Sequence, residues 1–154
     1  MNEQNINKIK DFLFSMRQFR SPEIFPIAAA ISRQEDYDIT AAELQKSGLP
    51  YIIVGDQHED LILAPMLERI VQGKGIILEL TGPLPPKIYG VCAGLFQSGV
   101  VNVHLAGELE PRVINPAPEG GYIILFMNDQ LFKDFEGRYI LSAFCNLANQ
   151  KEVA

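Results

Sequence analysis

The chain contains 154 residues, of which 47% are hydrophobic and 21% are charged, and its formal net charge is −6. This length and balance predict a single globular domain over residues 1–154, and no apolar run approaches the roughly 20 residues that cross a bilayer. The negative charge opposes the binding of long DNA or RNA through a broad basic face. We therefore expect neither a membrane nor a long nucleic acid among its partners.

The first residues, MNEQNINKIKDF, lack an apolar core followed by a small-residue cleavage site, which favours a cytoplasmic location. Cys92 and Cys145 are too few for a disulfide framework or a thiolate metal site. Both fall within predicted helices, where we expect them to act as small apolar fillers. No cofactor is expected.

The N-terminal half alternates helical and extended segments. An amphipathic helix is predicted over residues 3–20, where apolar side chains recur at helical spacing. The apolar run over residues 27–31 predicts a strand. Capping-box spacing at Thr40 predicts a short helix that ends at Gly48, and residues 51–54 predict a second strand.

The segment after this strand has two interpretations. Residues 61–63 either return as a hairpin strand or begin the next helix, and we favour the hairpin. Pro65 suits a first helical position, and the apolar face that follows it predicts a helix ending at Gly73.

The centre of the chain predicts a strand, a tight loop, a helix and a second strand. Residues 76–80 form the first strand, which Gly82 and the prolines after it bring to an end. A helix is predicted from Pro86, because proline presets the backbone of a first helical turn. Residues 100–105 predict the second strand, which runs parallel to the first if both lie in one sheet.

The C-terminal part predicts a long irregular stretch, a strand and a final helix. A short strand is allowed around Val113, and residues 122–127 predict a further strand. Asn128 is expected to cap the final helix, whose apolar face extends to Leu147 and is interrupted only by Gly137. Together the elements predict an α/β domain, with a mixed sheet of about five strands flanked by four or five helices.

The first candidate site is the predicted corner between a strand and a helix at residues 81–87. Ligands collect where strands of an α/β sheet meet helix N-termini, because the first helical N–H groups favour negative charge. Pro85 and Pro86 remove two such donors and exclude a phosphate loop or dinucleotide fingerprint. Thr81, Gly82 and Lys87 remain as ligand-binding candidates; the alternative is a rigid corner with a solvated lysine.

The second candidate site follows the next predicted strand. His104, Glu110 and Arg112 offer an imidazole, a carboxylate and a guanidinium that suit a phosphate ligand. If residues 100–105 belong to the main sheet, these side chains share a rim with residues 81–87. The alternative is a histidine on the polar face of a strand and an Arg112 bonded to Glu108 or Glu110.

A third cluster, Asp56-Gln57-His58-Glu59-Asp60, contains oxygen donors and an imidazole that suit a divalent metal. Its spacing matches no metal motif, so we interpret it as a solvated turn and predict no metal site.

The sequence GKGIILELTGPLPPKIYG, followed by a valine-rich strand and Glu110-Pro111-Arg112, resembles a small family of CRISPR-associated proteins that bind and degrade cyclic oligoadenylate. That family carries lysine-glycine, an aliphatic strand, glycine-x-glycine-proline, a helix, a valine-rich strand and aspartate-proline-arginine. The resemblance covers residues 73–112. It implies that Gly82 and Pro83 form the loop, that Arg112 lies beside the nucleotide, and that the fold is a ferredoxin-like sheet in a symmetric dimer.

The chain also departs from this family. Ala93, Gly94 or Leu95 stands where the family has a helical histidine, and Glu110 replaces the aspartate. Four extra residues, 106–109, precede it. The resemblance therefore implies nucleotide binding rather than nuclease activity.

Two functions follow from the sequence. The first is binding of a small phosphorylated or nucleotide-type anion at the rim, with or without weak phosphodiesterase activity. The alternative is an interaction or assembly subunit with no small-molecule site, acting as a homodimer or with a protein partner. No catalytic residue is assigned, and enzymatic activity is left open.

Overall fold

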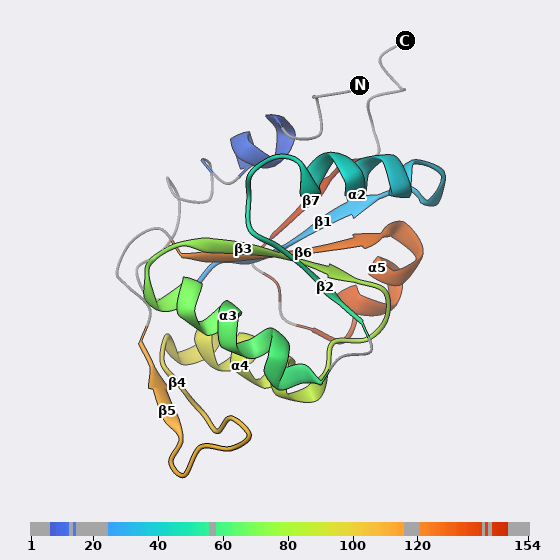
Figure 1. Cartoon of the computed structure of the whole chain (residues 1–154). Coiled ribbons are helices and arrows are strands. Elements are labelled where there is room, and N and C mark those ends of the chain that lie inside the picture. The colour runs from blue at the N-terminus through green and yellow to red at the C-terminus, as the bar shows by residue number, and fades with distance from the viewer. Residues whose placement is uncertain are drawn as a thin grey trace.

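Five parallel strands form the main sheet of the computed structural model, in the order β2-β3-β6-β1-β7 (Figure 1). The structure describes residues 7–12, 14, 25–55, 58–115, 121–139, 141 and 143–147. The strands of the sheet are β1 (Ile27–Ser32), β2 (Tyr51–Val54), β3 (Gly75–Leu80), β6 (Tyr122–Asn128) and β7 (Ala143–Asn146).

Helices connect these strands. They are the short 3-10 helix η1 (Gln34–Asp36), α2 (Tyr37–Gln45), α3 (Glu59–Val71), α4 (Pro86–Ser98) and α5 (Asp129–Glu136). Residues 7–12 and 14 are also helical, and the rest of the predicted first helix lies outside the described residues. The α/β class of the prediction is confirmed. No described helix has both the length and the apolar character that crossing a membrane requires.

The two faces of the sheet pack against different helices. Helix α2 lies over one face, and α3, α4 and α5 lie over the other (Figure 1). Because side chains alternate along a strand, each inner strand contributes to both cores. On β3, Ile77 faces α2, whereas Ile76 and Leu78 face α3 and α4. Burial on both faces explains why these strands read as almost continuous apolar runs.

Glycine is required at the start of β3. Gly75 lies opposite Tyr122 of β6, and a Cβ placed on Gly75 would lie 1.8 Å from the Tyr122 ring. The ring therefore occupies the space that any larger residue at position 75 would need.

The strand that follows α4 does not join the main sheet. Strand β4 (Val101–Val103) pairs antiparallel with β5 (Arg112–Ile114), and this hairpin projects from the domain beside α3 and α4 (Figure 1). The parallel partners of β3 are instead β2 and β6, and β6 follows the hairpin in sequence. A ferredoxin-like sheet contains antiparallel neighbouring strands, whereas every pairing in this main sheet is parallel. The ferredoxin-like arrangement implied by the resemblance is therefore wrong for this sheet.

Helix α3 corrects the expected hairpin at residues 61–63. It begins at Glu59, and His58 caps it by accepting a hydrogen bond from the Asp60 N–H. Pro65 therefore lies inside the helix rather than at its start. The continuous stripe of buried side chains on α3 outweighs the cost of an internal proline. That stripe consists of Ile62, Leu63, Met66, Leu67 and Ile70.

Two other helix boundaries differ from the prediction. Helix α2 begins at Tyr37, without a side-chain cap, and Glu43 is buried rather than part of a capping box. Helix α5 is capped by Asn128 as predicted but ends at Glu136, and β7 follows. Consequently the prediction of one long final helix was wrong, and Cys145 lies on a strand.

Candidate functional site

Parallel strands place the loops that follow them at one edge of the sheet. The carboxyl ends of β2 and β3 are neighbours at this edge, because these strands pair through Val54 and Leu80 at their last residues. The helices that follow, α3 and α4, begin beside each other there. The first turns of two helices thus meet where an α/β sheet ordinarily binds its ligands.

The Asp60 carboxylate joins three segments at this edge. Its Oδ1 accepts a hydrogen bond from Lys87 Nζ at 2.8 Å, and its Oδ2 accepts one from the Ala106 N–H at 2.6 Å. The bond from Lys87, together with that from Ala106, lowers the pKa of Asp60 below its usual range. The start of α3, the first turn of α4 and the loop after β4 are therefore held together.

Lys87 keeps part of its binding capacity. Its side chain is 37% exposed, and Asp60 occupies one of the three ammonium hydrogens. The N-terminus of α4 has no side-chain cap and no acidic residue in its first turn. Thr81 is exposed just before this turn, and a Cβ on Gly82 would meet no atom within 4 Å. The corner thus offers a cation and a hydroxyl to solvent, beside a helix start without a side-chain cap.

The β4–β5 hairpin carries the other three predicted site residues. His104, Glu110 and Arg112 are all exposed. His104 lies two residues before Ala106, so the Asp60–Ala106 bond brings it toward the same edge as Lys87. Because β4 is not in the main sheet, this proximity comes from the Asp60 side chain and not from neighbouring strand ends, as the sequence argument assumed.

Arg112 is already engaged by an acidic residue. Its Nε and Nη2 donate to the Glu108 carboxylate at 3.1 and 2.5 Å, and this pair raises the pKa of Arg112. This is the alternative that the sequence analysis kept open for Arg112. The guanidinium charge is thus balanced within the loop.

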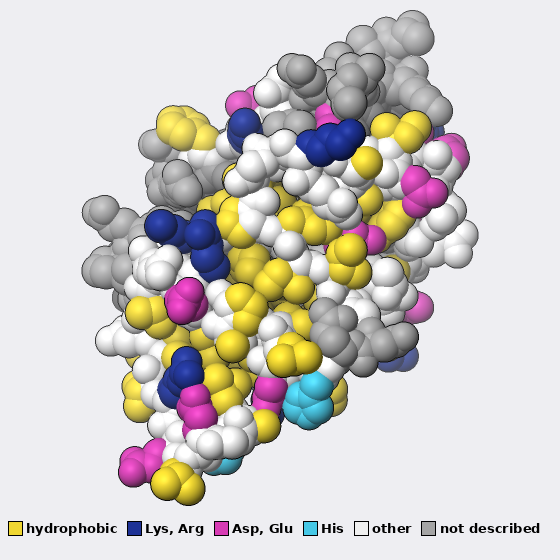
Figure 2. Space-filling model, viewed as in Figure 1, with side chains coloured by type: hydrophobic (Ala, Val, Ile, Leu, Met, Phe, Trp, Pro, Cys, Tyr) yellow, Lys and Arg dark blue, Asp and Glu magenta, His cyan; other side chains and the backbone are white. Residues whose placement is uncertain are grey.

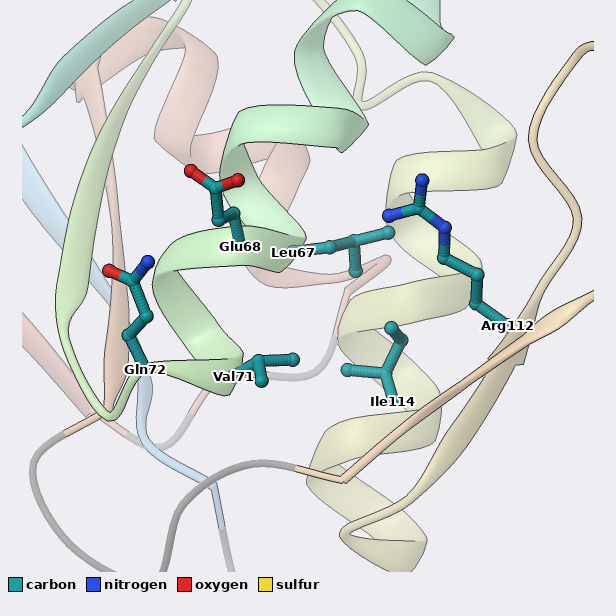
Figure 3. A pocket seen from close by; sticks show the side chains of 6 residues that line it. All are labelled: Leu67, Glu68, Val71, Gln72, Arg112 and Ile114. Atoms are coloured by element: carbon teal, nitrogen blue, oxygen red, sulfur yellow. The ribbon is translucent and has the colours of Figure 1, made fainter.

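Arg112 also borders a cavity of about 230 Å³ between β5 and the C-terminal half of α3 (Figure 3). The lining side chains are Leu67, Glu68, Val71, Gln72, Arg112 and Ile114. Asp60 and Glu68 are eight residues apart on α3, so this cavity lies about 12 Å along the helix from the Lys87 corner. Arg112 is therefore separated from the predicted residues at the Lys87 corner.

A buried polar cluster was missed by the sequence analysis. Glu79 of β3 is 7% exposed, and its carboxylate accepts hydrogen bonds from the hydroxyls of Tyr37 (2.6 Å) and Tyr51. Tyr37 also stacks on Phe126, with ring centroids 5.0 Å apart. Burial, followed by the bonds to Glu79, raises the pKa of both tyrosines above the ordinary value. The one sequence signal was a carboxylate inside an apolar run.

A second polar group lies where the chain leaves β1 and β6. These strands are neighbours, but the next helices cover opposite faces of the sheet, which makes this the topological switch point. Asn128 Nδ2 donates to Gln34 Oε1 at 2.6 Å across it. The two amides therefore satisfy each other at this position.

The remaining predictions concern metals and thiols. Among the described residues, no three His, Cys, Asp or Glu side chains are grouped to hold a metal ion, and Asp56 and Gln57 lie outside that part of the chain. Burial raises the pKa of Cys92 to about 12, and it also raises the pKa of Cys145. Both thiols stay protonated near neutral pH, which suits the role of apolar fillers.

Comparisons with protein-family models, with curated proteins and with solved structures found no match.

Proposed function

We propose that this chain binds a small phosphorylated or nucleotide-type ligand at the corner between β3 and α4. The observation that carries the proposal is the position of Lys87, whose ammonium Asp60 holds beside the uncapped start of α4. A phosphate at this corner gains from the lysine charge and from the N–H groups of Lys87 and Ile88, because Pro86 has no N–H and that of Tyr89 bonds the Pro85 carbonyl. Thr81 and the Gly82 backbone supply the remaining donors.

The loop after β4 forms the second wall of the proposed site. The Ala106 N–H bond to Asp60 ties it there, and His104 is the loop side chain that we expect to contact the ligand. Glu110 is farther along the loop, and Arg112, the first residue of β5, donates two hydrogen bonds to Glu108. Lys87 is paired as well, but Asp60 accepts only one of its three ammonium hydrogens. In this proposal the ligand therefore binds Lys87 first, and Arg112 takes part only by leaving Glu108.

An adenine nucleotide is the first ligand class to test. The proposal takes this class from the resemblance of residues 73–112 to proteins that bind cyclic oligoadenylate, in which Gly82 and Pro83 match the loop. Weak phosphodiesterase activity belongs to the same proposal, and cyclic oligoadenylate is the substrate class that it would take.

Thermal unfolding with added ligand tests the proposal. The melting temperature is measured with inorganic phosphate, AMP, ADP or cyclic oligoadenylate. At least one of these four ligands should raise it in a saturable manner. Lys87→Ala should abolish that rise, whereas Lys133→Ala, which removes an exposed lysine of α5, should preserve it. Equal protection of both variants, or no protection of the native chain by any of the four, contradicts the proposal.

A specific observation also favours the alternative, an interaction or homodimer subunit. Four large apolar side chains are exposed on α3, on β5 and in the loop between β4 and β5. They are Leu61, Val71, Leu109 and Val113, with exposures of 68, 48, 99 and 67%. Figure 2 shows hydrophobic side chains among acidic and basic ones on the viewed surface.

Light scattering tests this alternative. If the chain is a homodimer, the measured mass should exceed that of one chain, and the double variant Leu109→Ser with Val113→Ser should lower it. A native chain with the mass of a monomer counts against a homodimer.

A further inference from the structure

The cavity between α3 and β5 has an apolar floor and a charged margin (Figure 3). Leu67 and Val71, one helical turn apart on α3, point toward β5, where Ile114 faces them. Glu68 and Gln72 form the next stripe along α3, on the side of the floor away from β5. A molecule lying on this floor would have Arg112 on one side and Glu68 on the other.

The charges at this margin do not balance. Arg112 donates two hydrogen bonds to Glu108, so this pair contributes no net charge. Glu68 makes no hydrogen bond and no ion pair with any described residue, and it acts on Arg112 only through its electric field. The unmatched charge at the cavity is therefore negative, and the net charge of −6 adds to it at long range.

We infer that this cavity is a second binding site, which takes a small amphipathic ammonium compound. A branched aliphatic or single-ring body lies on Leu67, Val71 and Ile114, and its ammonium group binds the Glu68 carboxylate. The size is adequate, because the volume of about 230 Å³ exceeds the roughly 150 Å³ of an engineered cavity that admits benzene. This site is separate from the proposed phosphate site and does not depend on it, since it uses neither Lys87 nor α4.

A titration followed through methyl resonances tests the inference. The full chain is titrated with isopentylammonium chloride, with isopentyl alcohol as the uncharged match and sodium isovalerate as the anionic one. The methyl signals of Leu67, Val71 and Ile114 should shift in a saturable manner with the ammonium compound. Isopentyl alcohol should bind more weakly, and isovalerate should bind most weakly of the three.

Single substitutions distinguish the contribution of the Glu68 charge to binding from that of the apolar floor. Glu68→Gln should raise the dissociation constant of isopentylammonium by roughly two- to fivefold, the range expected for a solvent-exposed ion pair, and leave that of isopentyl alcohol unchanged. Val71→Ser, at a position that is 48% exposed and so tolerant of change, should weaken both compounds. Glu136→Gln makes the same substitution on α5, away from the cavity, and should change neither.

Three results would overturn the inference: methyl shifts that stay linear in concentration, tighter binding of isovalerate than of isopentylammonium, or an unchanged ammonium affinity in Glu68→Gln. Lys87→Ala should retain full isopentylammonium binding, so failure at this cavity is distinguishable from failure at the phosphate site.

Discussion

Glu79 is the residue whose environment differs most from what its sequence suggests. An isolated buried carboxylate is costly, but two tyrosine hydroxyls satisfy this one. Tyr37 and Tyr51 are 42 and 28 residues before it, so no local pattern identifies them as partners. The sequence predicted the strand around Glu79 correctly and gave no sign of the bonds that make its burial tolerable.

Replacement of either tyrosine should change stability and its dependence on pH. Tyr51→Phe or Tyr37→Phe removes one donor from Glu79 and should lower the free energy of unfolding by about 1–3 kcal/mol. The pKa of each hydroxyl is raised in the folded chain, so its stabilising contribution is complete below the unfolded value of about 10 and is lost as the pH rises further. Above about pH 10 the free energy of unfolding falls with pH, and in each variant this slope should be smaller by the equivalent of about one proton.

Denaturant unfolding at several pH values measures both effects. Tyr139→Phe is the matched control, because Tyr139 packs against Tyr89 and Phe135 away from Glu79. Native alkaline slopes in both Tyr37→Phe and Tyr51→Phe would show that neither hydroxyl has a raised pKa in the folded chain.

At the scale of elements, the cap of the last helix was predictable, but the capping box at Thr40 and the length of that last helix were predicted wrongly. Asn128 was expected to cap a helix, and its Oδ1 accepts a hydrogen bond from the Leu131 N–H at 2.8 Å. The apolar pattern from residue 129 to Leu147, by contrast, fits one helix as well as a helix followed by a strand. The outcome depends on β1, whose free side pairs with β7, and this pairing is invisible in the local sequence.

Removal of the Asn128 cap should weaken α5. Asn128→Ala deletes the acceptor for the Leu131 N–H and should lower the free energy of unfolding by about 1 kcal/mol. Gln34→Ala serves as the control, because it removes the bond from Asn128 Nδ2 and keeps the cap. Denaturant unfolding at neutral pH measures the free energy of unfolding of both variants. Equal losses would assign the effect to the bond between Asn128 and Gln34 and not to the cap.

Replacement of Pro65, unlike that of Asn128, should stabilise the protein. It lies inside α3, where proline lacks the N–H that would bond the Leu61 carbonyl, and its side chain is exposed. Pro65→Ala should therefore raise the free energy of unfolding by about 1–2 kcal/mol, after allowance for the greater freedom of the unfolded chain. A lower melting temperature in a calorimetric scan would mean that α3 requires the proline.

For the whole molecule, the sequence predicted the class of fold better than its connections. Apolar runs located β1, β2, β3 and β6. The signal was strong for β1, β3 and β6, because these strands are buried on both faces. The order of the strands depends on which helices pack on which face of the sheet. These contacts join residues far apart in the sequence, so no local pattern reveals the order. The valine-rich strand after α4 therefore looked like a neighbour of β3, although it pairs with β5 in a separate hairpin.

The candidate site was predictable to a similar extent. The corner at residues 81–87 follows from local rules, since a buried strand, a proline stop and a helix start are all written in that segment. The partner of Lys87 was not predictable, because Asp60 is 27 residues away and belonged to a turn that we interpreted as solvated. Arg112 was expected at the same rim, but the hairpin places it against the far half of α3.

The central claim is that the start of α4 binds a phosphate with the help of Lys87. A titration of the isotopically labelled chain with the phosphate ligand found by melting, followed through backbone amide resonances, tests it most directly. We predict saturable shifts that are largest for the N–H groups of Gly82, Lys87 and Ile88 and that disappear in Lys87→Ala. Shifts confined to Gln34 and Asn128 at the switch point, or none that saturate, would contradict the account.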